Sequence, residues 1–124
     1  YNTMMKEANK KTSAIWIPLK SIVPSKTILP LVLEKAWAKK IPVVSNNPSH
    51  TRLGGLMALY PHHFAMGQQL GAFAIAHMEG SGANSINGTY ALKQAINVRT
   101  GAHLGLRLDD SELEHYDKVF PRMR

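Results

Sequence analysis

The 124-residue sequence predicts an α/β fold, built as a three-layer α/β/α lobe in which helices cover both faces of a mainly parallel sheet. Three observations lead to this class. Short apolar runs recur along the chain, amphipathic segments with helical period separate them, and loops rich in proline, serine, asparagine or glycine stand between the two kinds of segment. Strands that alternate with helices form parallel sheets through right-handed crossovers, so the apolar runs are expected to lie side by side.

The individual elements follow from apolar periodicity and from the turn residues between them. In chain order we expect a helix at 2–11, a strand at 14–17, a helix capped by Ser25 or Thr27 that ends at 39–40, a strand at 41–44, turn residues at 45–49, a helical turn at 51–55, a strand at 56–60, a helix at 61–79, a strand at 90–98, a short helix at 100–104 and a last helix at 111–120. Ser111 is expected to cap the last helix. Trp16, Trp37 and His77 fall on apolar faces of their elements and are expected in the core.

The overall composition excludes several classes of protein. An apolar fraction of 44% with 19% charged residues is typical of a folded chain and not of a disordered one. The apolar runs are shorter than the roughly 18 residues that a membrane span needs. Fifteen Lys and Arg face eight Asp and Glu, but the basic residues are scattered and no nucleic-acid motif accompanies them, so no nucleic-acid partner is expected. The chain has no cysteine, which excludes disulfides and thiolate chemistry.

The ends of the three central strands predict a binding site. In sheets of this kind, ligands lie beyond the carboxyl ends of the strands. The loops at these ends hold hydroxyls, amides, an aromatic ring, a lysine and an imidazole, which suit hydrogen bonding to a small polar or zwitterionic solute. The candidate ligand-binding residues are Lys20, Ser21, Ser45, Asn46, Asn47, Tyr60 and His62.

The same loops argue against an enzyme, because none of them contains Asp or Glu. Ser45 and His62 could form a dyad, but no acid would orient the imidazole. His62, His63 and His50 have no carboxylate or thiolate near them in the sequence, so a metal site is not expected. We therefore predict no catalytic residue, metal or cofactor, and interpret the chain as a binding module.

Four segments, in order, carry the pattern of one known family: AIWIPLKSIVPS at 14–25, KIPVVSNNPSHTRLGGLMALYP at 40–61, PHHFAMGQQLGAFAIAHMEG at 61–80 and QAINVRTGAHLGLRL at 94–108. They resemble the ABC-transporter substrate-binding proteins with the type-1 periplasmic-binding fold, in the branch that includes binders of tryptophan and other aromatic amino acids. The resemblance implies a two-lobed protein that closes around a solute for an ABC-type importer. Residues 1–124 would be its C-terminal lobe, with the N-terminal lobe absent.

The resemblance also implies roles and partners. Lys20 and Ser21 match the first ligand-facing loop of the family, and residues 45–47 match the second. Tyr60 and His62 stand where many members have a small residue and an Asp, so the solute need not be an amino acid. The implied partners are a small-molecule solute and a membrane permease, and the implied location is periplasmic or extracellular, with a lipid anchor left open.

Two further expectations concern the fragment and its role. The isolated lobe is expected to form homodimers, because the missing lobe would leave apolar surface and a strand edge exposed. A ligand-sensing domain of a receptor or regulator with the same fold remains the alternative function.

Overall fold

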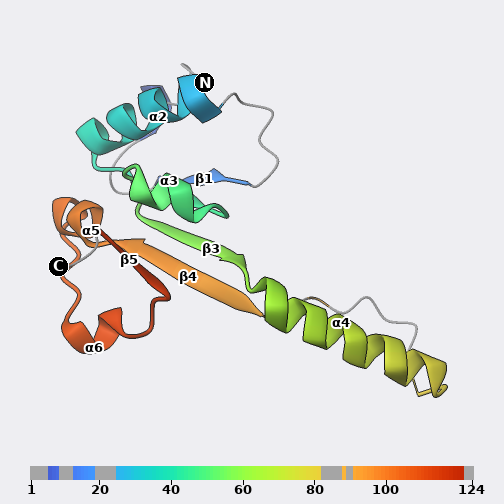
Figure 1. Cartoon of the computed structure of the whole chain (residues 1–124). Coiled ribbons are helices and arrows are strands. Elements are labelled where there is room, and N and C mark those ends of the chain that lie inside the picture. Colours follow the sequence, from blue (N-terminus) through green and yellow to red (C-terminus); the bar gives the residue numbers. More distant parts are fainter. Residues whose placement is uncertain (1–5, 9–12, 19–24, 82–87, 89–90, 122–124) are drawn as a thin grey trace. The chain divides into compact units, whose positions relative to one another are not determined.

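The computed structural model describes residues 6–8, 13–18, 25–81, 88 and 91–121. Five strands form one sheet in the order β1-β2-β3-β4-β5 (Figure 1). Their bounds are β1 Ile15–Ile17, β2 Val43–Ser45, β3 Met57–Pro61, β4 Leu92–Asn97 and β5 Lys118–Phe120. The pairs β1–β2, β2–β3 and β4–β5 are all parallel. The predicted α/β class with a mainly parallel sheet is therefore confirmed.

Between β3 and β4 the chain reverses direction. The amide of Asn97 donates to the carbonyl of Leu56, and the amide of His62 donates to the carbonyl of Ala91, each over 2.8 Å. The bonded partners advance in opposite directions along the two strands, which is the antiparallel arrangement. This is the step that keeps the sheet from being wholly parallel.

The helices occupy positions along the chain close to those predicted. They are α2 Ser25–Lys39, α3 Pro48–Arg52, α4 His63–Met78, α5 Val98–Leu104 and α6 Asp110–Leu113. Of the helix expected at 2–11, only residues 6–8 lie within the described part of the chain, and residues 6–7 are helical there. The chain divides into two compact units, the first made of residues 1–59 and 94–124 and the second of residues 60–93.

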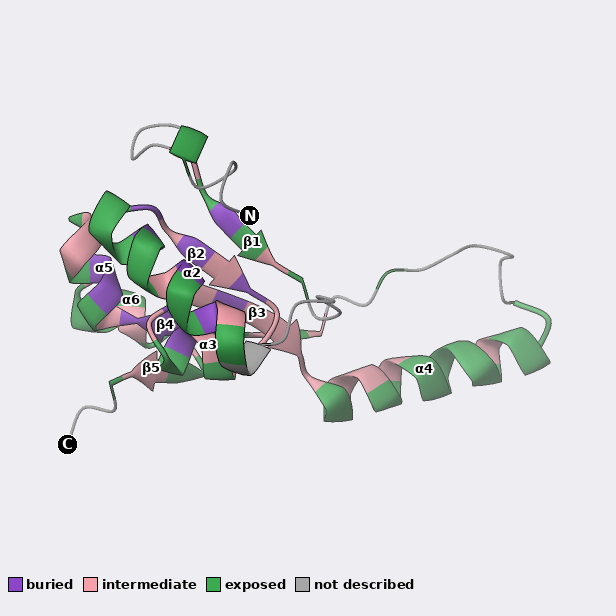
Figure 2. Cartoon of the chain, turned by 90° about the horizontal axis from the view of Figure 1, so that it is seen from above, coloured by how far each residue is buried: buried purple, intermediate pink, exposed green. Residues whose placement is uncertain are grey.

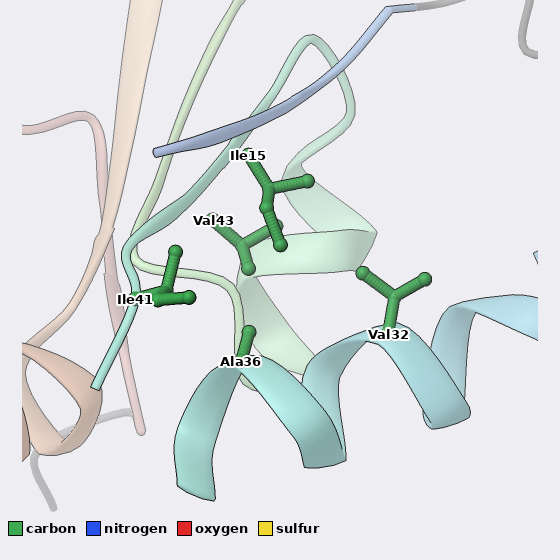
Figure 3. Close-up of a cluster of buried hydrophobic side chains, with 5 residues drawn as sticks. All are labelled: Ile15, Val32, Ala36, Ile41 and Val43. Carbon is green, nitrogen blue, oxygen red and sulfur yellow. The ribbon is translucent and has the colours of Figure 1, made fainter. Parts of the chain in front are cut away.

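The core of the first unit lies between α2 and the first two strands. Val32 and Ala36 of α2 face Ile15, Ile41 and Val43, and all five side chains are buried (Figure 3). Valine and isoleucine suit short strands because their branched side chains pack well on a pleated surface. The apolar stripe that predicted α2 is thus the face that the helix buries.

The C-terminal segment differs from its prediction. Instead of one helix at 111–120, the structure has the single turn α6 followed by strand β5, whose residues 118–120 pair with residues 95–97 of β4. Asp109, not Ser111, is the N-cap of α6, and it forms a capping box with Glu112. The apolar residues Val119 and Phe120 extend the sheet, so tertiary pairing overrode the helical pattern.

Three residues expected in the core are exposed instead. Trp16 is 68% exposed, because Ile15 and Ile17 point to the α2 side of β1 and alternation turns Trp16 to the other face. Trp37 is 37% exposed and stacks flat on His103 of α5, with ring centroids 3.8 Å apart. His77 is exposed on α4. Their apolar neighbours in sequence indicated burial, but within the described part of the chain too little packs on these three side chains to bury them.

Candidate functional site

The carboxyl ends of β1 and β2 are aligned by the register of the sheet, and the first two residues of β3 lie beside the end of β2. Ile17 at the end of β1 pairs with Ser45 at the end of β2, and Ser45 pairs with Ala58 of β3. Parallel neighbours end at the same edge, so the residues that follow β2 lie next to the end of β1. The first unit therefore contains a polar edge at the strand ends, where the sequence analysis expects one.

Ser45 is the buried centre of this edge, at 2% exposure. Its hydroxyl lies 3.2 Å from the carbonyl of Ile17 and 2.8 Å from Nδ1 of His50, and it accepts the amide of Asn47 at 3.1 Å. A hydroxyl has one hydrogen to donate and two lone pairs. All three contacts are satisfied together when Ser45 donates to Ile17 and accepts from Asn47 and from a protonated Nδ1 of His50. The Ser45 hydroxyl is thus fully used in joining β1, β2 and α3.

His50 is the partner that sequence reasoning missed for Ser45. It stands in the first half of α3, where one helical turn brings its ring back to the end of β2. Burial lowers the pKa of His50 below its ordinary value of 6.5, so the neutral imidazole prevails at neutral pH. The sequence feature that could have identified this pair is the spacing of five residues between Ser45 and His50, with the start of a helix between them. No carboxylate bonds to this histidine among the described residues, so the pair lacks the third member of a catalytic triad.

Asn46 joins the strands on their outer face. Its Oδ1 accepts the indole N–H of Trp16 at 3.2 Å, and its Nδ2 donates to the carbonyl of Leu59 at 3.2 Å. Asn46 therefore connects a side chain of β1 to the backbone of β3 across the end of β2. Trp16 is the second residue of the edge that sequence reasoning missed, although strict alternation in the run Ile15-Trp16-Ile17 places it opposite the core face.

Asn47 serves as the N-cap of α3. Its side-chain oxygen accepts the amide of Ser49 at 2.9 Å, and its backbone is extended, with φ of −124°. Asparagine is favoured at this position because its short side chain satisfies an amide that the helix leaves free. Ser45, Asn46 and Asn47 thus lie at and just after the carboxyl end of β2, and each has a structural partner in this chain.

The remaining predicted site residues fall outside the described part of the first unit. Lys20 and Ser21 lie outside the described residues. Tyr60 and His62 belong to the second unit, where His62 is the N-cap of α4 and its Nδ1 accepts the amide of Ala65 at 3.3 Å. Their assignment to one ligand face stays a prediction.

A hollow of about 1110 Å³ opens elsewhere on the first unit. It is lined by α3, the β4–α5 junction and β5, and includes Arg52, Arg99 and Lys118, which are exposed. Exposed basic side chains around an open depression are typical of a solvated surface. The strand-end edge instead gathers buried and half-buried polar groups, so it is the better candidate.

The described residues give no indication of a metal centre or a membrane span. No group of three or more His, Asp or Glu lies close enough in this part of the chain to hold a metal ion. Within the same ranges, no helix has both the length and the apolar content for crossing a bilayer.

The comparison with protein families decides what the chain is. Residues 1–120 match the family described as ABC transporter substrate binding protein. The chain belongs to the ABC transporter substrate-binding protein family. This is a family of substrate-binding proteins and not of enzymes, and its members work outside the cytoplasm. The predicted family is confirmed, and the interpretation as a binding module agrees with it. No curated protein matches the chain.

Three solved structures share the fold of this substrate-binding family member. An ABC domain in complex with L-Trp from Streptococcus pneumoniae is 20% identical, with a TM-score of 0.57 over 95% of this chain and 40% of its own. A ligand-free, open substrate-binding protein with adhesive properties from Clostridium difficile is 18% identical, with a TM-score of 0.64 over 95% and 39%. A conserved domain protein from Vibrio cholerae is 18% identical, with a TM-score of 0.55 over 89% and 37%. The chain spans at most two fifths of each.

Proposed function

We propose that this chain is the C-terminal lobe of the solute-binding component of an ABC-type importer, and that its strand-end edge forms one wall of an interlobe cleft. The observation that carries the proposal is the exposed indole of Trp16, held by Asn46 at the carboxyl edge of the sheet. An exposed tryptophan is unusual on a free surface, and an aromatic ring fixed by an amide is a common element of solute sites.

The length of the similar structures supports the two-lobed interpretation. Each of them is more than twice as long as the part this chain matches. A second lobe facing the edge would cover Trp16 and close the site, as hinged binding proteins do. The permease partner and the extracytoplasmic location, with or without a lipid anchor, follow from family membership and are part of the proposal.

The chemistry of the edge indicates a small polar or zwitterionic solute. The edge combines the flat ring of Trp16 with the amides of Asn46 and Asn47. Rings contribute apolar contact and stacking, whereas amides can exchange their present partners for carboxylate or ammonium groups of a ligand. One similar structure contains L-Trp, which makes free amino acids the first solutes to test.

The experiment is a calorimetric titration of the complete gene product with a panel of free amino acids that begins with L-tryptophan. Trp16→Ala and Asn46→Ala should each weaken the binding of the preferred solute by about 1–3 kcal/mol. Trp37→Phe is the matched control, because Trp37 stacks on His103 of α5 and is not part of the edge. Within residues 1–124 the same variant leaves only Trp16, so the difference between its fluorescence and that of the Trp16→Ala variant reports the binding of non-aromatic solutes.

Three results would contradict parts of the proposal. If both edge variants bound the solute with wild-type affinity, the edge would not be part of the binding site. If no solute of the panel bound the complete product, free amino acids would be excluded as the solute class. If no other small polar solute changed the Trp16 fluorescence either, the proposed solute-binding function would be wrong.

A further inference from the structure

The polar side chains at the end of β2 already use most of their hydrogen-bond acceptors within this chain. The side-chain oxygens of Ser45, Asn46 and Asn47 each accept a hydrogen bond from a donor of the first unit. A further acceptor belongs to His50, whose ring is bonded to Ser45 through Nδ1. The state of its second ring nitrogen, Nε2, therefore decides what this edge can still offer to a solute.

The hydrogen bonds of Ser45 determine which nitrogen of His50 carries the proton. The carbonyl of Ile17 can only accept, so the single hydroxyl hydrogen of Ser45 is directed to it over 3.2 Å. Nδ1 of His50, 2.8 Å from the same hydroxyl, must then be the donor of its own hydrogen bond. Burial lowers the pKa of His50, so the ring is neutral at neutral pH and carries one N–H. Nε2 is therefore left with a lone pair and acts as an acceptor.

Nε2 of His50 is an acceptor without a donor. Among the described residues no hydrogen bond reaches this atom. The ring is half-buried, and α3, which carries it, includes buried, intermediate and exposed residues (Figure 2). Water can reach such a nitrogen while the edge is open to solvent. A cleft that closes over the edge displaces this water, and an acceptor left unpaired there weakens binding.

The amide nitrogen of Asn47 complements this acceptor. Oδ1 of Asn47 caps α3, whereas Nδ2 has two hydrogens and no acceptor among the described residues. Residues 45–50 contain no Asp or Glu, so this segment offers a solute no negative charge. The segment thus presents a neutral acceptor at His50 and a donor at Asn47. A solute with both an N–H group and a carboxylate satisfies the two together.

We infer that Nε2 of His50 contacts the bound solute and accepts a hydrogen bond from one of its N–H groups, which in a free amino acid is the α-amino group. The inference rests on the proposed function and assigns a specificity-determining residue to the same site. The ring of Trp16 stacks on flat or apolar groups of many kinds, so it discriminates little between them. An unpaired Nε2 penalises a solute without the N–H group, because a closed site provides no other donor for it.

The test is calorimetry on the complete gene product with amino acids and their deamino analogues. The pairs are L-tryptophan with indole-3-propionate and L-phenylalanine with 3-phenylpropionate, which differ in the amino group. The wild type should bind the amino acid about ten- to a hundredfold more tightly than the analogue. His50→Asn should weaken the binding of the amino acid by a similar factor and leave that of the analogue almost unchanged, which is the coupling expected of two groups in contact.

Two substitutions at His50 separate solute contact from structural support. The amide nitrogen of Asn lies near the position of Nδ1 and can still donate to Ser45, but Asn has no atom at the position of Nε2. Gln reaches the position of Nε2 with an acceptor and gives up the hydrogen bond to Ser45. His50→Gln should therefore recover most of the affinity lost in His50→Asn while unfolding at a lower urea concentration. His103→Asn is the matched control, because the His103 ring bonds to the carbonyl of Trp37, and it should keep the wild-type affinity.

Three outcomes would overturn the inference. Wild-type affinity in His50→Asn, or an equal loss for the amino acid and its analogue, would show that Nε2 does not meet the amino group. Equal losses of affinity in the Asn and Gln variants, in step with their stability, would show a purely structural histidine. If no amino acid bound at all, the inference would be wrong, and the fluorescence titration with other small polar solutes would decide separately whether the proposed function fails with it.

Discussion

Helices α2 and α4 have almost the same length, 15 and 16 residues, and opposite relations to solvent. α2 carries Glu34, Lys35 and Lys39 on its exposed side, and buries Leu29, Val32 and Ala36. α4 has no Asp, Glu, Lys or Arg, and its residues are exposed or half-buried. The helix with the more polar sequence is the one that this chain buries, because burial depends on what lies opposite a helix as well as on its own apolar content. The following predictions test that difference.

The largest expected effect is a matched pair of leucine truncations. Leu29→Ala should lower the free energy of unfolding of the 124-residue chain by about 2–5 kcal/mol, because Leu29 is 5% exposed and its loss leaves a cavity against the sheet. Leu70→Ala on α4 should change it by about 0.5 kcal/mol or less, since Leu70 is 62% exposed. Urea unfolding monitored by circular dichroism gives both values. Equal losses would mean that α4 is packed in the isolated chain.

A smaller effect is expected at the N-cap of α4. His62 accepts the amide of Ala65 through Nδ1, so His62→Ala should leave that amide unsatisfied and weaken the helix by about 1 kcal/mol. The loss should appear as faster hydrogen exchange in residues 63–66, while the global unfolding free energy stays the same. A matching fall in global stability would show that the two units unfold as one.

The smallest effect is a pH dependence confined to the first unit. The pKa of His50 is lowered in the folded state by burial, so the unfolded chain takes up the proton more readily. Its stabilising contribution is present above about pH 6.5 and is lost as the pH falls below that value. Thermal unfolding between pH 7.5 and about pH 5 should therefore show a drop in midpoint that His50→Asn reduces. His63→Asn, exposed at the start of α4, is the control and should leave the drop in place.

The sequence alone determined the alternation of strands and helices, the parallel pairing of 15–17, 43–45 and 57–61, and the gathering of Ser45, Asn46 and Asn47 at one edge. Local patterns suffice to predict these features, because apolar runs, prolines and polar turns determine the backbone conformation within a few residues of themselves. Four ordered segments also indicated the family that the match over residues 1–120 confirmed.

Only the tertiary structure decided which apolar residues find a partner. Residues 118–120 became a strand because the edge of β4 was available for pairing, although their spacing suited a helix. Trp16 and Trp37 stayed near the surface, and the Ser45 hydroxyl was taken up by His50 and Ile17. The physical reason is the same in each case: burial and hydrogen bonding are properties of pairs of surfaces, and a single sequence segment specifies only one member of each pair.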